Sequence, residues 1–298
     1  MTATTVPPAV PPAEGSAGDR PDRATASVRG SLPLRAEILR QLRRRRTIGV
    51  FAIIAVLPLV LLLAFWLGRD GTPSATPGFV DLAQESGANL TVFALFASTS
   101  FLVIVIVALF AGDTVPAEAS WSSLRYLLAA PVRRERLLRQ KLLVAALSSV
   151  VALVVLPAWT FVIGGLAYGF GPYVGPTGDQ LPVTTFGLRL LVIVAYLIVD
   201  LAVVGAIAFA IGTRTDAPLA AVGGAVLIMI VCAILDSITA LGSLRDALPG
   251  HYAYAWADAL NPTVDPSQMI TGALWSVGYT VVLLALSWWH FLRKDVTS

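Results

Sequence analysis

Asp200 is the residue whose chemistry demands most explanation, because it lies midway along an apolar stretch, residues 186–212. A carboxylate at the centre of a membrane-spanning helix costs roughly 2.5–3.5 kcal/mol on insertion scales, so its side chain should face protein or water. Arg189 lies 11 positions earlier, about 16 Å along a helix, and no basic residue shares the depth of Asp200. The carboxylate could bind a cationic substrate or relay protons. A protonated Asp200 hydrogen-bonded inside the helix bundle is the alternative.

Few other residues could carry catalysis. Cys232, the single cysteine, lies in an apolar run and is expected to be a small buried hydrophobe. The two histidines, His251 and His290, belong to no HExxH or CxxC pattern, so no metal site is expected. A serine protease would need a Ser and a His at matched depth, and an aspartyl site would need two buried acids. The sequence offers neither, which argues against an enzyme within the membrane.

Nucleotide hydrolysis by this chain is also disfavoured. Its two lysines, Lys141 and Lys294, follow Gln140 and Arg293 rather than the glycine of a P-loop. A P-loop needs Gly-Lys-Ser/Thr because the lysine must reach the phosphates from a glycine-rich turn. We therefore expect the chain to bind no nucleotide, metal or other cofactor itself.

The elements that must position Asp200 are membrane helices. Hydrophobic residues make up 56% of the chain and charged residues 13%, whereas a soluble domain carries roughly 25% charged residues. Such a chain must present apolar surface to lipid. The predicted fold is all-α and polytopic, with six transmembrane helices within residues 48–292. The six apolar segments, each close to or above the roughly 20 residues that cross a bilayer, are 48–68, 90–112, 142–170, 186–212, 217–235 and 270–291.

Basic residues predict the orientation of these helices. With the N-terminus in the cytoplasm, 18 of the 21 basic residues fall on the inner side, so both termini are predicted to be cytoplasmic. Residues 1–30, rich in Pro, Ala, Thr and Gly, are expected to form a disordered tail. Residues 31–47 combine an apolar stripe with arginines, which favours an amphipathic helix on the membrane surface over a nucleic-acid site. The arginines expected among the lipid headgroups are Arg40, Arg43, Arg44, Arg45 and Arg46.

The outer loop before the last predicted span, residues 236–269, carries aromatic residues among prolines and glycines. This pattern predicts short helices at the membrane interface. Small residues within the spans predict close helix packing. They are Gly164, Gly165, Gly223 and Gly224.

The first inner loop, residues 113–141, is long and basic. Leu124, Leu127 and Leu128 share one face of a short predicted helix that Pro131 ends, and a basic helix then leads into the third span. The arginines of this loop could simply hold lipid phosphates. The positive-inside rule does not account for an acidic residue beside a membrane, because Asp and Glu contribute little to helix orientation. Glu118 is therefore expected to have a structural or coupling role.

This inner loop resembles that of the permeases of type-2 ABC transporters. Those permeases carry a Glu, a Gly-Thr-Leu-Arg-like turn, a Pro-Val-x-Arg element and a Lys at the start of the third span. The matching positions here are Glu118, Ser122-Ser123-Leu124-Arg125, Pro131-Val132-Arg133-Arg134 and Lys141. Ser122 stands where the family commonly has Gly. The likeness in layout covers roughly residues 31–292.

The resemblance implies a permease dimer, formed with a second copy or a paralogue, in the bacterial cell (inner) membrane. Each permease touches a separate ATPase, which holds ATP and Mg, and export of a hydrophobic small molecule, lipid or glycan is the usual activity. The ATPase-coupling residues implied by the resemblance are Glu118, Leu124, Arg125, Leu127, Leu128, Pro131 and Arg134. The candidates for substrate contact are Asp200, Trp159 and Phe161. The aromatic residues expected to line the cavity are Phe96, Phe101, Trp159 and Phe161.

The alternative function is an ion-gradient-driven secondary transporter that uses Asp200. That class often shows repeated halves, interrupted helices and several intramembrane charges. This sequence has one convincing intramembrane charge and no visible repeat. Such a transporter would work without a partner ATPase, which distinguishes the two functions.

Overall fold

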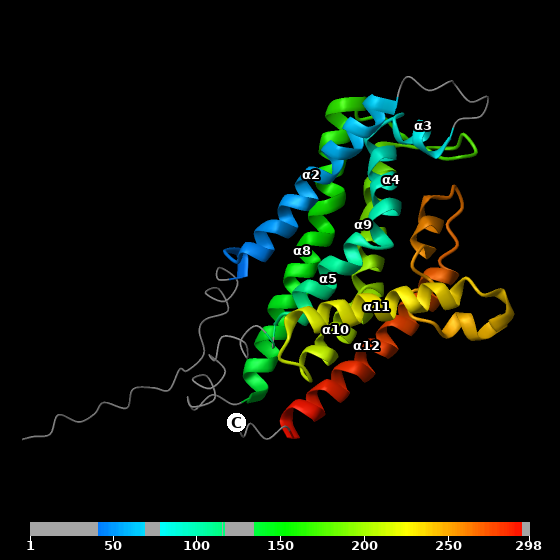
Figure 1. Cartoon of the computed structure of the whole chain (residues 1–298). Coiled ribbons are helices and arrows are strands. Elements are labelled where there is room, and N and C mark those ends of the chain that lie inside the picture. The colour runs from blue at the N-terminus through cyan, green and yellow to red at the C-terminus, as the bar shows by residue number, and fades with distance from the viewer. Residues whose placement is uncertain (1–40, 69–77, 115, 117–133, 294–298) are drawn as a thin grey trace, which may run out of the picture. The chain divides into compact units, whose positions relative to one another are not determined.

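Apolar helices make up most of the chain in the computed structural model, which describes residues 41–68, 78–114, 116 and 134–293. Every described residue belongs to the unit that begins at Ser31, and Figure 1 draws the described residues in colour. The longer helices of this unit are α2 (Arg45–Leu67), α4 (Gly87–Thr99), α5 (Leu102–Gly112), α8 (Arg134–Tyr168), α9 (Val183–Asp200), α10 (Ala202–Gly212), α11 (Pro218–Asp236) and α12 (Ser267–Arg293).

Five of these helical stretches are long and apolar enough to cross a membrane, namely α2, most of α8, α9 with α10, α11, and most of α12. A sixth crossing exists if α4 and α5, which meet at an angle of 59°, form one broken span. Large apolar side chains such as Trp66, Leu188 and Leu274 are exposed on these helices, and lipid is the solvent that such surfaces require. The chain is therefore a multi-pass membrane protein, and the predicted all-α class is confirmed.

Glycines allow α4 and α8 to pack closely. A Cβ atom added to Gly87 would lie 2.5 Å from the backbone nitrogen of Gly165, and one added to Gly164 would lie 2.9 Å from Leu90. Small residues permit such close approach of helix backbones in a membrane. Gly164 and Gly165 thus lie in a helix contact, whereas a Cβ added to Gly223 would meet no atom within 4 Å.

A short β-hairpin, absent from the prediction, connects α8 to α9. Its strands β1 (Tyr173–Val174) and β2 (Gln180–Leu181) pair antiparallel. Asn89 of α4 holds the hairpin, because its Nδ2 donates to the Val174 carbonyl at 2.8 Å and its Oδ1 accepts from the Val174 amide at 2.9 Å. The hairpin and α3 (Phe79–Ala83) lie at the same end of α8 (Figure 1).

Two short 3₁₀ helices, η2 (Thr239–Ala247) and η3 (Ala255–Leu260), occupy the segment predicted to contain short helices. Arg189 of α9 anchors the second one. Its guanidinium donates to the carbonyls of Ala259 at 3.0 Å, of Pro262 at 3.4 Å and of Asn261. These bonds satisfy carbonyl groups at the end of a helix, where no amide of the same helix is available.

The structure also shifts the boundary of the first predicted span. Gln41 and Leu42 are helical, Arg43 and Arg44 form a turn, and α2 begins at Arg45 rather than at residue 48. The predicted tail, residues 1–30, and Arg40 of the predicted surface helix lie outside the described residues. So do six of the predicted coupling residues, which are Glu118, Leu124, Arg125, Leu127, Leu128 and Pro131.

Candidate functional site

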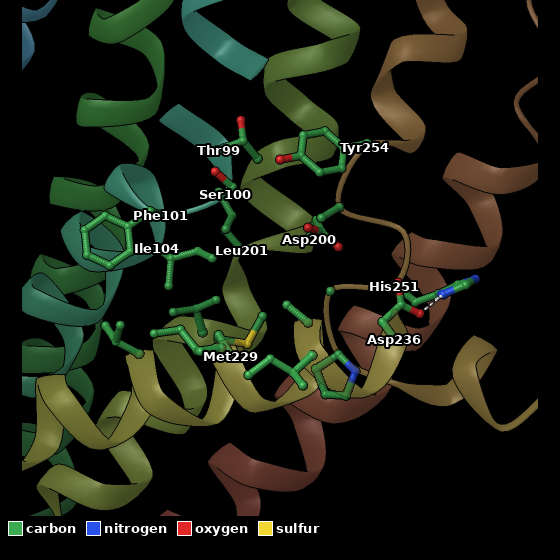
Figure 2. Close-up of a pocket in the computed structure, with 18 of the residues that line it drawn as sticks. Thr99, Ser100, Phe101, Ile104, Asp200, Leu201, Met229, Asp236, His251 and Tyr254 are labelled. Atoms are coloured by element: carbon green, nitrogen blue, oxygen red, sulfur yellow. Dashed lines mark hydrogen bonds and ion pairs between the residues drawn. The ribbon is translucent and has the colours of Figure 1, made fainter. Parts of the chain in front are cut away.

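A cavity of about 490 Å³ lies beside the break between α4 and α5. The helices α9 and α10 form one continuous span, with Leu201 in helical conformation between them. Residues of the α4–α5 break and of the α9–α10 span line the cavity together with α11 and the segment that follows it (Figure 2). An interrupted helix exposes backbone and polar side chains at membrane depth, which is tolerated where they line a cavity.

The first interruption follows from a run of hydroxyl residues, Ser98-Thr99-Ser100. The side chains of Ser98 and Thr99 each donate to the backbone carbonyl four residues earlier, at 2.6 Å in both cases. Such bonds compete with the hydrogen bonds of the helix and bend it. Phe101 then leaves the helical region, with φ −141° and ψ −59°. The bend places Ser100 and Phe101 in the cavity wall.

Asp200 is the last residue of α9 and only 4% exposed. Ser276 of α12 donates from its hydroxyl to Oδ1 of Asp200 at 3.0 Å. Among the residues that the structure describes, no other side chain forms a hydrogen bond or an ion pair with this carboxylate. Tyr196 lies one turn earlier, but its hydroxyl donates to the Tyr252 carbonyl at 2.6 Å. A buried carboxylate with one neutral donor lacks the compensation that a buried charge needs.

Asp236, at the end of α11, also lines the cavity, but it has basic side chains as partners. Its Oδ1 lies 3.5 Å from Nε of Arg245 and 2.5 Å from Nδ1 of His251. The other ring nitrogen of His251 lies 3.5 Å from Asp246. These contacts connect α11 to η2 and to the chain after it, and Figure 2 shows the Asp236–His251 pair at the edge of the group around Asp200. Within the described ranges, no group of His, Cys, Asp and Glu residues is placed to hold a metal ion.

Aromatic side chains form part of the cavity wall. Phe101 and Tyr254 both line it (Figure 2). Tyr254 stacks on Phe96 with the ring centroids 5.7 Å apart, and Phe96 in turn packs on the buried Trp256 at 4.5 Å. This stack holds the ring of Tyr254 in place.

The other two predicted substrate contacts lie elsewhere. Nε1 of Trp159 donates to the carbonyl of Ala55 on α2 at 3.0 Å. Phe161 stacks on Phe186 with the centroids 6.1 Å apart. Neither side chain lines the cavity that contains Asp200. The structure therefore separates Asp200 from Trp159, which is 38% exposed beside α2, and from Phe161, which packs against α9.

A second charged cluster lies at the start of the 113–141 loop. Asp113, which directly follows α5, forms ion pairs with Arg46 and, at 3.6 Å, with Arg44. Burial raises the pKa of the Asp113 carboxyl, while Arg46, Arg44 and Lys141 act in the opposite direction. The cluster fastens the beginning of the loop to the beginning of α2. We call these three residues, Asp113, Arg44 and Arg46, the loop anchor.

The predicted surface and coupling residues are only partly placed. Arg44 and Arg46 have a protein partner in the loop anchor, whereas Arg43 and Arg45 are exposed. Arg134, the one predicted coupling residue within the described backbone, begins α8. The basic helix expected before the third span is thus continuous with that span.

A family model matches residues 50–297, which include all of the helices from α4 to α12 and most of α2. The chain belongs to the DUF2705 family. The description of DUF2705 is a protein of unknown function, so membership assigns no activity. No curated protein matches the chain. The DUF2705 match includes the Asp200 cavity and Asp113, but it begins after Arg44 and Arg46.

Sequence reasoning singled out Asp200 and Phe101, which line the same cavity, but it missed the other polar groups around Asp200. Ser276 gives no signal, because serines are common in membrane helices and the contact joins residues 76 positions apart. Asp113 could have been found by the argument applied to Glu118, since it is an acidic residue at the end of a predicted span. The Ser98-Thr99-Ser100 run could likewise have indicated the break between α4 and α5.

Proposed function

We propose that this chain is the membrane-spanning subunit of an ATP-driven ABC transporter that exports a hydrophobic compound from a bacterial cell. The residues of the 113–141 loop support this function through their resemblance to type-2 permeases. In this proposal the loop docks on a separate ATPase, and two membrane subunits form the dimer. Both termini are cytoplasmic, and the chain itself hydrolyses no nucleotide.

The observation that carries the proposal is the way in which the ends of the loop are held. The loop anchor ties the beginning of the loop to α2. At its other end the chain enters α8 at Arg134, a helix of 35 residues. That helix is about 52 Å long, whereas the hydrocarbon core of a bilayer is about 30 Å thick. A displacement of the loop by a partner would therefore be transmitted along one continuous helix through the bundle.

The distribution of charge supports the same orientation. Basic residues lie at the start of α2, at the start of α8, after α10 and at the end of α12. These positions share one side of the membrane if each span crosses it once. An excess of Lys and Arg is typical of cytoplasmic loops.

Site-specific crosslinking tests the docking surface. A photoreactive amino acid at Leu124 should crosslink to an ATPase in the native host, because this position lies on the face expected to dock. The control places the same group at Leu219, at the start of α11, which is 83% exposed and should lie on the same side of the membrane. Crosslinks at both positions or at neither would contradict the proposal.

One observation favours the second candidate, a secondary transporter that uses Asp200. Secondary transporters commonly bind ions and substrates where helices are interrupted near the midplane, and Asp200 lines such a cavity. The two functions differ in their energy source. Uptake or release that proceeds in ATP-free vesicles and stops when an ionophore removes the ion gradient would favour this candidate.

A further inference from the structure

We propose that the Asp200 cavity binds hydrophobic organic cations, with the carboxylate of Asp200 holding the cationic group. This inference rests on the proposed function, because it names the class of compound that the transporter would carry. The bound cation supplies the positive counter-charge that the carboxylate of Asp200 needs. The organic part of the ligand lies against the aromatic and aliphatic wall.

The charges around the cavity favour a cation over an anion or a neutral compound. Asp236 already has Arg245 and His251 as partners. Asp200 has the neutral hydroxyl of Ser276 as its hydrogen-bond partner among the described residues and is 96% removed from solvent. An intramembrane carboxylate needs a counter-charge or a proton to offset the loss of hydration. Asp200 is thus the acidic residue of the lining that has no positively charged partner among the described residues, and a bound cation would provide one.

The remaining wall suits an organic body better than a bare ion. Apolar side chains of α5, α10 and α11 line the cavity beside Asp200, and examples are Ile104, Val204 and Met229. Phe101 and Tyr254 add two aromatic rings (Figure 2), and ring faces attract cations in addition to their apolar contacts. The volume of about 490 Å³ lies within the range of small-molecule sites, about 300–1,000 Å³.

The site exists only in the folded bundle, because its residues come from elements that are far apart in the sequence. Asp200 comes from α9, the aromatic residues from the α4–α5 break and from the segment after η2, and the aliphatic wall largely from α11. The Ser276 bond connects this group to α12. A ligand here would contact the α4–α5 break, the α9–α10 span and α11 at once.

Binding of tetraphenylphosphonium tests the inference. The full-length chain, with any protein that co-purifies, is placed in nanodiscs of neutral phosphatidylcholine and titrated with the radiolabelled cation. Asp200→Asn keeps an oxygen acceptor for Ser276 and a nearly unchanged volume while it removes the charge. We expect saturable binding to the native chain and an affinity at least tenfold lower in this variant, which corresponds to about 1.4 kcal/mol.

Three controls make the test selective. Asp216→Asn removes the same charge from an exposed position between α10 and α11 and should leave the affinity unchanged. Ser100→Phe adds volume to the cavity wall at an exposed position and should weaken binding without touching Asp200. Tetraphenylborate has nearly the same shape with the opposite charge and should show no saturable binding.

The inference is overturned if tetraphenylphosphonium shows no saturable binding, if Asp200→Asn binds it as tightly as the native chain, or if tetraphenylborate binds equally well. The assay needs no ATPase. Cation binding by a chain that has no ATPase partner would therefore refute the proposed function and leave the cation site standing. An ATPase partner without cation binding would do the reverse.

Discussion

Replacement of Gly87 by alanine should destabilise the protein through one helix contact. A Cβ atom at this position would lie 2.5 Å from the backbone nitrogen and 2.8 Å from the Cα of Gly165 on α8. Backbone atoms cannot rotate away as a side chain can, so α4 and α8 must move apart. The same movement stretches the hydrogen bond from the Gly87 amide to the Gly169 carbonyl, which is 3.0 Å long.

The expected size follows from three contributions. An extra methyl in a packed contact costs about 1–3 kcal/mol, and the upper half of this range applies because backbone is displaced. Weakening of the Gly87–Gly169 hydrogen bond costs up to about 1 kcal/mol. Alanine gains at most about 1 kcal/mol over glycine in a helix. Gly87→Ala should therefore lower the free energy of unfolding by about 2–3 kcal/mol.

Equilibrium unfolding in mixed micelles, followed by circular dichroism, measures this change. Gly278→Ala is the matched control, because a Cβ atom there meets nothing within 4 Å. It should leave the free energy of unfolding unchanged or raise it by up to about 1 kcal/mol. Equal stability of the two variants would refute the packing of α4 on α8.

Three further substitutions test other contacts. Gly272→Ala places a Cβ 2.5 Å from the Tyr196 hydroxyl and 2.5 Å from the Cβ of Tyr252 and should lower the free energy of unfolding by about 1–3 kcal/mol; the same measurement with Tyr196→Phe present, which removes the hydroxyl, should show a smaller loss. Arg189→Lys cannot reproduce the three carbonyl contacts of the guanidinium, so amide hydrogen exchange in residues 255–261 should accelerate while that of α4 stays unchanged. Asp113→Asn breaks a partly exposed ion-pair cluster of about 1 kcal/mol and should reduce captured ATPase about fivefold without changing cation binding.

The helices were predictable because their signal is strong. Each crossing is a run of about 20 apolar residues, and composition alone requires lipid-facing surface. Helix boundaries were harder to predict at charged ends. At Arg45, for example, α2 begins before the apolar run does, because the backbone hydrogen bonds of a helix do not depend on the membrane. The helical character of the segment after α11 was also predictable, since aromatic residues mark the interface.

Contacts between distant residues were not predictable from single-chain patterns. The compensation of Asp236 by His251 depends on a loop folding back on the end of α11. The pairing of Asp113 with Arg46 joins residues 67 positions apart. Nothing in the spacing of Trp159 or Phe161 distinguishes a cavity residue from one that packs between helices, because both environments favour aromatic side chains.

The same holds for most of the residues that surround Asp200 in the cavity. A buried Asp200 could be inferred from its cost in a membrane. Apart from Phe101, its neighbours could not, because they come from the α4–α5 break, from α11 and from a loop, and the apolar pattern does not mark which of these residues meet. The hydroxyl run before Phe101 is the one local signal, and its effect on the helix follows from side-chain bonds to the backbone.

Purification of the tagged full-length chain from its native host, in mild detergent, tests the proposed function most directly. The account predicts a stoichiometric ATPase in the purified complex. It also predicts that this ATPase is lost when Glu118 and Arg125 are replaced together by alanine, while the membrane chain itself remains folded and abundant. A stable complex, purified intact and reproducibly without an ATPase, would contradict the account.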